Sequence, residues 1–166
     1  MTGQPSIDGN EELLVRAAGP EDVAAITGLI NKAFQVERFF LGSDRIRADE
    51  VRARIAQGTF LLLLSGGTLL GCVYAELRGT SGFIGLLSVE PQRQKAGFSR
   101  LLMTAAEDYF RRNGCRQAEL RLVNLRIELP PYYRHLGYRE IATEELPAEI
   151  ARILPCHLIV MTKALV

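Results

Sequence analysis

The segment from Gly82 to Asn113 constrains the fold more than any other part of the chain. It reads as an apolar strand, then a polar loop that contains proline and glycine, then an amphipathic helix. In such a loop a glycine comes directly before the helix. Several backbone N–H groups are then unpaired at the positive end of the helix dipole. Such a helix start is suited to bind an anion such as a pyrophosphate.

The composition indicates one domain of a soluble globular protein. The chain has 166 residues, of which 48% are hydrophobic and 23% charged, enough to bury a core. The net charge of +1 predicts neither nucleic acid nor an anionic membrane as a partner. The three cysteines fit no metal-ligand spacing, so no metal is expected. Phe60–Leu64, the longest apolar run, is too short to cross a membrane, and residues 1–11 read as a flexible polar tail without a signal peptide. A cytoplasmic location follows as the expectation.

Hydrophobic periodicity predicts alternating strands and helices over residues 12–166, with no linker that would mark a second domain. This order predicts an α/β fold in which a mixed sheet carries helices on both faces. The expected strands are Leu13–Ala17, Thr59–Leu64, Thr68–Leu77, Phe83–Val89, Gln117–Asn124 and Cys156–Lys163. The expected helices are residues 20–34, Ala48–Gln57, residues 98–113 and Tyr132–His135.

The helix after the loop shows a clear division into two faces, and Gly114 is expected to end it. The face predicted to be buried carries Phe98, Leu101, Leu102, Ala105 and Tyr109. The face predicted to meet solvent carries Thr104, Glu107, Asp108, Arg111 and Arg112.

Two motifs of this chain resemble those of the GNAT N-acetyltransferases. The loop sequence QKAGFS, Gln94–Ser99, resembles the acyl-CoA pyrophosphate signature Q/R-x-x-G-x-G/A, and YYRHLGY, Tyr132–Tyr138, is similar to the family's L-Y-E-K-L-G-F element. The resemblance covers roughly Leu13 to Leu165. It implies the GNAT fold, with a mostly antiparallel twisted central sheet, and acetyl-CoA as co-substrate without a metal. The chain departs from the family at Ser99, where Gly or Ala is usual, and at Leu129–Pro131, which lengthens the spacing before the tyrosines.

The resemblance also implies a set of cofactor-binding positions. The backbone of the loop and helix start is expected to hold the pyrophosphate. Val89 is expected to face the thioester oxygen with its N–H, and Leu87 to pair with the pantetheine arm. Asn124 either hydrogen-bonds the arm or only forms a turn, and the Ser99 hydroxyl either donates to the pyrophosphate or caps the helix. The loop residues implied are Gln94, Lys95, Ala96, Gly97, Phe98 and Ser99.

Tyr133 matches the family tyrosine that protonates the departing thiolate. A phenol with an ordinary pKa of about 10 is protonated at neutral pH and serves as an acid toward a thiolate. The amine needs a base, for which Glu76 on the third strand and a chain of waters are the alternatives. Phe39 and Phe40, in the segment after the first helix, are expected to line the acceptor site unless they only pack in the core.

These expectations together predict an acyl-CoA-dependent N-acetyltransferase. The leading acceptor is the primary amine of a small molecule, because the chain lacks the charge excess suited to polybasic tails. A protein or peptide N-acetyltransferase and a non-catalytic acyl-CoA-binding domain are the alternatives. A serine hydrolase is disfavoured, because Ser99 follows a loop instead of the tight strand-to-helix turn of a nucleophile elbow. A homodimer is suggested by family habit alone.

Overall fold

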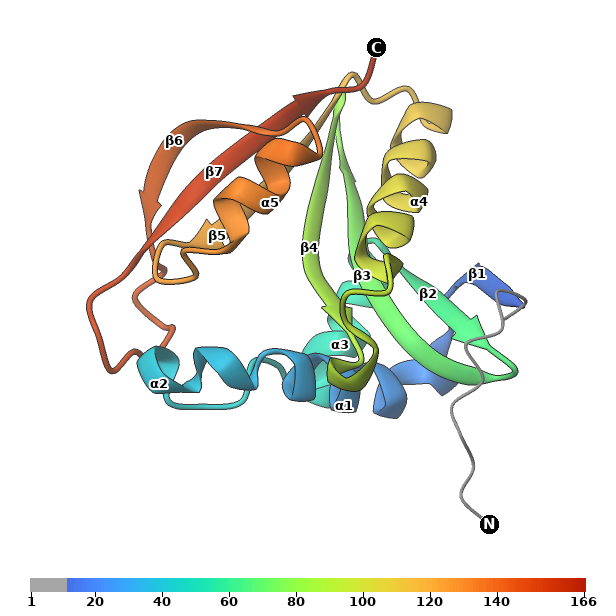
Figure 1. The fold of residues 1–166 in the computed structure, drawn as a ribbon, viewed down its shortest axis with the longest axis horizontal. Coiled ribbons are helices and arrows are strands. Elements are labelled where there is room, and N and C mark those ends of the chain that lie inside the picture. The colour runs from blue at the N-terminus through green and yellow to red at the C-terminus, as the bar shows by residue number, and fades with distance from the viewer. Residues whose placement is uncertain (1–11) are drawn as a thin grey trace.

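The computed structural model describes residues 12–166, which form a seven-stranded sheet with helices on both faces (Figure 1). Residues 1–11, for which a flexible tail is predicted, lie outside the described residues. The strands are β1 Leu13–Ala17, β2 Thr59–Ser65, β3 Thr68–Arg78, β4 Ser81–Val89, β5 Gln117–Val123, β6 Arg139–Glu145 and β7 His157–Ala164. The helices are α1 Val23–Ala33, α2 Arg38–Leu41, α3 Ala48–Gln57, α4 Phe98–Arg112 and α5 Leu129–His135, with 3-10 turns at Pro20–Asp22, Gln35–Glu37 and Pro91–Arg93.

The strands lie in the order β1-β2-β3-β4-β5-β7-β6. Every neighbouring pair is antiparallel except β4 and β5, which run parallel. Parallel neighbours need a long crossover, and α4 supplies it. The predicted α/β fold with a mixed, mostly antiparallel sheet is therefore confirmed.

Two hydrophobic cores lie on opposite faces of the sheet. α4 and α5 cover one face together with the inward side chains of β5 and β7, whereas α1 and α3 cover the other face over β2 to β4. β2 feeds both cores, because Leu61 and Leu63 point to the α4 side and Phe60 and Leu62 to the α1 side. This explains the apolar run in β2. Within residues 12–166, no helix combines the length and hydrophobicity needed to cross a bilayer.

Four details of the predicted elements are wrong. β6 was not predicted, and the short α2 was not distinguished from loop. α5 begins at Leu129, earlier than predicted, because Pro130 and Pro131 occupy its first turn, where a missing N–H costs nothing. The buried face of α4 is also rotated: Glu107 is buried, whereas Leu101 is 37% exposed. The buried residues of α4 are Phe98, Leu102, Met103, Ala106, Glu107 and Phe110.

Candidate active site

β4 and β5 are paired at one end of the sheet and separate at the other. They pair over Ser81–Ile84 and Gln117–Leu120, and both strands continue beyond the last pair (Figure 1). A bulge in β4 lies just past this point, where Leu86 has a φ of 54°, an unusual value for a leucine. Bulges bend a strand and increase its twist, so this one turns β4 away from β5. We call the place where the two strands separate the fork.

The backbone of Val89 points into the fork. Val89 lies opposite Gly71, and the next residue, Glu90, donates its N–H to the Leu70 carbonyl at 2.8 Å. That pattern makes Gly71–Val89 a non-hydrogen-bonded pair, in which both backbone polar groups of Val89 point away from β3. Leu87, nearer the bulge, packs half-buried against the core on the α4 side.

The loop after β4 delivers the chain into α4 through two left-handed residues. Lys95 has a φ of 70° and Gly97 a φ of 83°, and Gly97 is the N-cap. The first helical hydrogen bond runs from the Leu101 N–H to the Gly97 carbonyl at 3.2 Å. The N–H groups of the three residues between them therefore have no acceptor within the helix. Residues 94–97 are exposed, whereas Phe98 is buried and anchors the helix start.

This loop has the properties of an anion site. A Cβ added at Gly97 would meet no atom within 4 Å, so the space above the loop is open. The unpaired N–H groups and the dipole of the 15-residue α4 favour negative charge there. Lys95 and Arg100 are exposed beside it, and the Arg93 guanidinium lies 5.4 Å from the centre of the Phe98 ring.

Ser99 does not cap α4, because Gly97 holds that position. Instead, the Ser99 hydroxyl shares a hydrogen bond of 2.6 Å with the Tyr132 hydroxyl of α5. The bond ties the first turn of α4 to α5, which reaches the same face of the sheet from beyond β5. The sequence-based alternatives for Ser99 did not include this contact, because its partner is 33 residues away.

Tyr133 is buried and packs between two other tyrosines. The ring lies between those of Tyr132 and Tyr138, at centroid distances of 5.1 Å and 6.0 Å. No group within residues 12–166 hydrogen-bonds the Tyr133 hydroxyl. Burial raises the pKa of Tyr133 above its usual value, so the phenol stays protonated at neutral pH.

A buried ion pair lies beside Tyr133. Arg126, in the turn between β5 and α5, donates to the Glu37 carboxylate at 2.8 Å and to that of Glu128 at 2.6 Å. Glu37 is only 5% exposed, and burial raises its pKa, although Arg126 opposes the shift. The charge of Arg126 also acts on the Tyr133 phenol, whose pKa it lowers in opposition to burial. Sequence reasoning missed this pair, because 89 residues separate its members.

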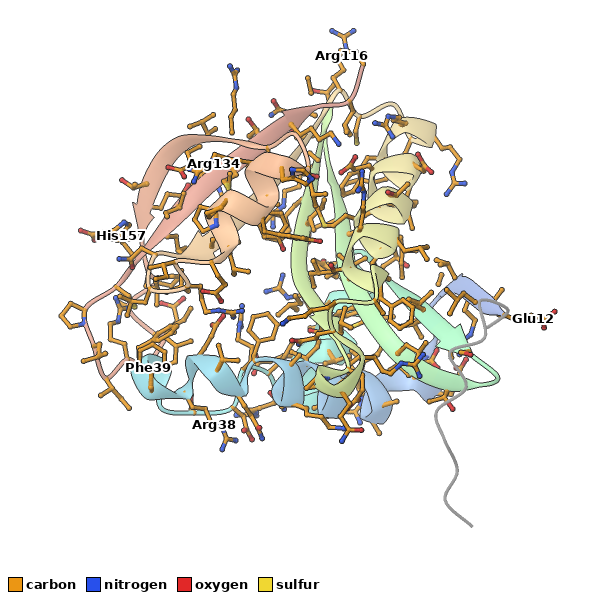
Figure 2. All side chains as sticks on the ribbon, in the orientation of Figure 1. Glu12, Arg38, Phe39, Arg116, Arg134 and His157 are labelled. Atoms are coloured by element: carbon orange, nitrogen blue, oxygen red, sulfur yellow. The ribbon has the colours of Figure 1, made fainter. Side chains whose placement is uncertain are left out.

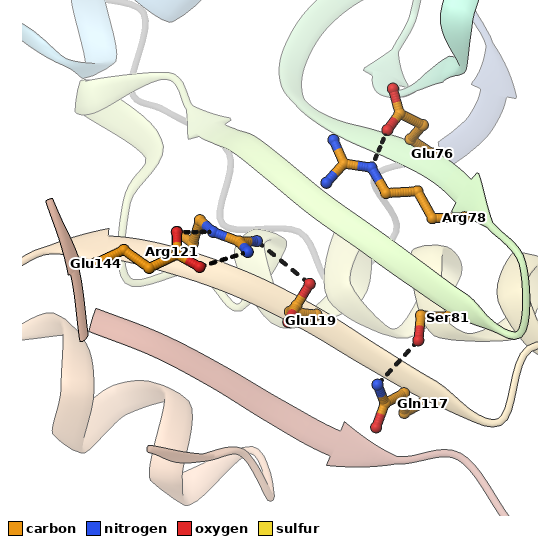
Figure 3. Close-up of polar contacts among 7 residues, drawn as sticks. All are labelled: Glu76, Arg78, Ser81, Gln117, Glu119, Arg121 and Glu144. Carbon is orange, nitrogen blue, oxygen red and sulfur yellow. Dashed lines mark hydrogen bonds and ion pairs between the residues drawn. The ribbon is translucent and has the colours of Figure 1, made fainter. Parts of the chain in front are cut away.

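Glu76 lies on the sheet face opposite α4, within a row of charges that crosses β3, β5 and β6 (Figure 3). Its carboxylate accepts a hydrogen bond from the Tyr74 hydroxyl at 2.7 Å and pairs with Arg78. Burial alone raises the pKa of Glu76, but Tyr74 and Arg78 outweigh it and hold that pKa below its usual range. Because Glu76 pairs with Phe83, it lies near the hairpin end of β4, roughly 20 Å along the strand from Val89. The other ion pairs in the row join Arg121 to Glu119 and Glu144.

The structure places Asn124 at the end of the β5–β7 pairing. Its side-chain oxygen accepts a hydrogen bond from the His157 N–H at 2.8 Å, and its own N–H donates to the His157 carbonyl at 2.9 Å. The side-chain oxygen therefore holds the start of β7 against β5. This contact is compatible with a turn-forming role, one of the two predicted for Asn124.

Phe39 and Phe40 have different surroundings on α2. Phe39 is 59% exposed at the end of the molecule away from Arg116 (Figure 2), whereas Phe40 has no exposed surface. Their rings meet edge to face at 4.6 Å, and the Phe40 carbonyl accepts from the Ile153 N–H at 2.6 Å. The β6–β7 connection thus packs on α2. Of the two phenylalanines, Phe39 alone presents a surface for a ligand in this arrangement.

The loop before α4, the end of β4 and Tyr133 thus lie on the same face of the sheet, whereas Glu76 lies on the other face and nearer the hairpin end of β4. Unpaired N–H groups at a helix start favour an anion such as a pyrophosphate. Residues 12–166 contain no group of three or more His, Cys, Asp or Glu arranged to hold a metal ion.

Comparisons with known proteins identify the fold and the family. Among solved structures, the chain resembles ribosomal-protein-S18-alanine N-acetyltransferase from Escherichia coli, with a TM-score of 0.76 and 13% identity over 93% of this chain and 94% of that one. It also resembles yncA from Salmonella typhimurium, solved with acetyl-CoA, with a TM-score of 0.72 and 21% identity over 93% and 95% of the two chains. N-acetylglutamate synthase from Neisseria gonorrhoeae matches with a TM-score of 0.71 and 20% identity, over 93% of this chain and 35% of that one.

At these identities the likeness to solved structures establishes the fold. No curated protein matches the sequence significantly. The family profile described as the acetyltransferase (GNAT) domain matches residues 19–155, which is most of the chain. The protein therefore belongs to the GNAT family of acetyltransferases.

Proposed function

We propose that the protein transfers the acetyl group of acetyl-CoA directly to the primary amine of a small molecule, with Tyr133 as general acid. The observation that carries the proposal is the exposed helix start at Gly97 on the same face of the sheet as Tyr133, whose hydroxyl makes no hydrogen bond within residues 12–166. Thioester aminolysis needs a site that holds the cofactor, and the loop supplies it. It also needs a proton donor near the thioester, and Tyr133 supplies that.

In this proposal the loop holds the pyrophosphate of acetyl-CoA through the backbone of Gln94–Ser99. Its open surface and its unpaired helix N–H groups support the assignment. The pantetheine arm lies along β4 in the fork, beside Leu87. The N–H of Val89, which points away from β3, donates to the thioester oxygen. Asn124 borders the other side of the fork at the end of β5.

The amine nitrogen attacks the thioester carbonyl carbon and forms the new C–N bond, while the C–S bond breaks. Tyr133 donates its phenolic proton to the departing thiolate, which leaves as the CoA thiol. The amine loses a proton to Glu76 or to water. The lowered pKa of Glu76 keeps it ionised but makes it a weak base, and its place near the hairpin end of β4 favours transfer through intervening water. Phe39 borders the acceptor site.

Isothermal titration with acetyl-CoA tests the cofactor half of the proposal. Wild-type protein is expected to bind with a dissociation constant in the micromolar range, and Gly97→Glu to lose at least about tenfold in affinity, because a carboxylate then occupies the anion site. Gly79→Glu is the matched control: Gly79 also has a positive φ and open space, but it lies in the β3–β4 turn. Failure of wild-type protein to bind acetyl-CoA or longer acyl-CoAs would overturn the proposal.

Turnover tests the catalytic half. Acetyl transfer to a panel of small primary amines is followed by release of the CoA thiol. Product formation with small amines supports the proposal. Transfer confined to peptide or protein amines would favour a protein or peptide N-acetyltransferase. Binding of acetyl-CoA with no transfer to any amine would identify a non-catalytic acyl-CoA-binding domain.

A further inference from the structure

A pocket lies at the end of the sheet away from the candidate active site. It has a volume of about 540 Å³ and is lined by the β3–β4 turn and by residues at the start of β5, the start of β6 and the end of β7. Arg116, which lines it, marks this end of the molecule in Figure 2. Ser81 of the pocket begins β4 and Val89 ends it, so roughly 25 Å of strand separates the pocket from the end of β4 in the candidate site.

The charged side chains that line the pocket are all basic. Arg116 comes just before β5, Arg139 begins β6, and Lys163 lies near the end of β7; no aspartate or glutamate of residues 12–166 lines the pocket. Neither the Arg116 nor the Arg139 side chain forms a hydrogen bond or an ion pair within the described part of the chain. The Lys163 ammonium donates to the buried Glu107 carboxylate at 2.7 Å. The two arginines are therefore the charges in the pocket that lack a carboxylate partner.

The acidic residues on the surrounding elements are bound to other cations. Glu119 of β5 pairs with Arg121 at 3.3 Å, and Glu140 of β6 pairs with Arg134 at 2.8 Å. The same holds for two acids on β3 and α4, where the pairs are Glu76 with Arg78 and Asp108 with Arg111. Because these carboxylates have cations of their own, the pocket keeps a net positive charge, which favours an anion from outside the chain.

Hydroxyl and amide groups line the pocket together with the arginines. The Gln117 side chain donates to the Ser81 hydroxyl at 2.9 Å, which leaves the Ser81 proton available to a ligand (Figure 3). Thr162 of β7 is only 7% exposed, and its hydroxyl makes no hydrogen bond within residues 12–166. A buried hydroxyl without a partner is costly, and a polar ligand in the pocket that Thr162 lines would supply the partner.

The remaining residues of the pocket indicate the body of the ligand. They are Thr80, Gly137 and Ala164, so no aromatic ring and no large aliphatic side chain of residues 12–166 lines the pocket. Gly137 lies against Lys163, because a Cβ added to the glycine would meet the lysine Cε at 3.2 Å. Such a surface has no ring to stack on a nucleobase and no apolar wall to bury an acyl chain. It suits a small body that carries hydroxyl groups.

We propose that this pocket binds a phosphorylated sugar or polyol, with the phosphate held by Arg116 and Arg139. A guanidinium group offers two parallel N–H donors to two phosphate oxygens, and two such groups offset the charge of a phosphate dianion. The hydroxyl groups of the ligand then bond to Ser81, Gln117 and Thr162. This inference goes beyond the proposed acetyl transfer and does not depend on it.

Isothermal titration with glucose 6-phosphate, ribose 5-phosphate and glycerol 3-phosphate tests the inference. Wild-type protein is expected to bind at least one of them with a Kd below about 1 mM, and to bind glucose and inorganic phosphate at least about tenfold more weakly. Arg116→Gln and Arg139→Gln should each weaken binding by at least about fivefold, and both residues are exposed, so the fold should be kept. Arg112→Gln is the matched control, because Arg112 is an exposed arginine in the last turn of α4 that does not line the pocket.

Gly97→Glu separates this pocket from the loop before α4. The variant is expected to bind the sugar phosphate as wild-type protein does, because Gly97 follows the far end of β4. Loss of binding in Gly97→Glu with unchanged binding in Arg139→Gln would place the sugar phosphate on the loop and overturn the inference. Absence of binding to all three phosphorylated compounds, equal affinity for inorganic phosphate, or an equal effect of Arg112→Gln would also overturn it. The acetyl-CoA titration tests the proposed function separately, so the two failures are distinguishable.

Discussion

The hydroxyl groups of Ser99 and Tyr132 lie 2.6 Å apart and join the first turn of α4 to α5. The two helices lie on the same face of the sheet but on opposite sides of the fork, so the bond links the two walls of the candidate active site. The family signature has a residue without a hydroxyl at the position of Ser99. This chain therefore has a hydrogen bond between α4 and α5 that the family signature does not require.

We predict that the Ser99 hydroxyl stabilises the fold without contributing to cofactor binding. Ser99→Ala and Tyr132→Phe should each lower the free energy of unfolding by about 1 kcal/mol, because each removes one member of the same bond. The double variant should lose little more than either single one, which a double-mutant cycle in urea would measure. The acetyl-CoA dissociation constant should stay within about threefold of wild type in all three. A tenfold weaker affinity for Ser99→Ala alone would show instead that the hydroxyl donates to the pyrophosphate.

Tyr133→Phe should reduce kcat by at least about 100-fold and leave the acetyl-CoA dissociation constant near that of wild type. The ring packing between Tyr132 and Tyr138 is kept, and the proton donor alone is lost. Because burial raises the pKa of Tyr133, its ionisation should cause no loss of activity below about pH 10, its ordinary pKa. Tyr132→Phe is the control, since its hydroxyl is engaged with Ser99. An unchanged kcat in Tyr133→Phe would remove the general-acid assignment.

Two glycine-to-alanine changes should have opposite effects on stability. An added Cβ at Gly82 would lie 2.3 Å from the Phe110 ring, where α4 packs on β4, so Gly82→Ala should cost about 2 kcal/mol of unfolding free energy. Gly28 lies inside α1 with open space above it, so Gly28→Ala should stabilise the protein by about 0.5–1 kcal/mol. Chemical denaturation of both variants measures the difference. Equal changes in the free energy of unfolding for the two variants would contradict the close packing of Phe110 on Gly82.

Asp22 should contribute to stability at neutral pH and lose that contribution in acid. Its carboxylate binds Arg16 at 2.8 Å and 2.9 Å and the Gly19 N–H at 2.8 Å; the hydrogen bond from Arg16 is the main reason that its pKa falls to about 2. A folded-state pKa below that of the unfolded chain stabilises the fold above about pH 4, and the effect disappears as the pH falls toward about 2.

Asp22→Asn should therefore cost about 1 kcal/mol at pH 7, since solvent screens the partly exposed Arg16, and nothing near pH 2. Urea denaturation at several pH values measures this. Glu21→Gln, a neighbouring exposed acid, is the control. If the loss of unfolding free energy in Asp22→Asn did not change with pH, the charge of Asp22 would not be the source of the stabilisation.

Local patterns in the sequence predicted most elements, but not those defined by distant partners. β6 was missed because every residue of Arg139–Glu145 is exposed, so no apolar alternation marks it; it is a strand because it pairs with β7 at the edge of the sheet. The buried face of α4 was misplaced because Glu107 looks like a surface residue. Its partners, Lys163 at 2.7 Å and the Tyr138 hydroxyl at 3.0 Å, come from other parts of the chain.

The sequence by itself determined the order of most strands and helices, the family and the position of the loop before α4. These features follow from local patterns, namely hydrophobic periodicity, turn residues and helix ends. Only the tertiary structure decided what surrounds the chemistry. The pairing of Ser99 with Tyr132 and the buried Glu37–Arg126 ion pair both depend on segments far apart in sequence. The identity of a charged residue does not show whether its partner is another side chain, water or a ligand. The partner depends on which groups the fold brings within a few ångströms of the charge.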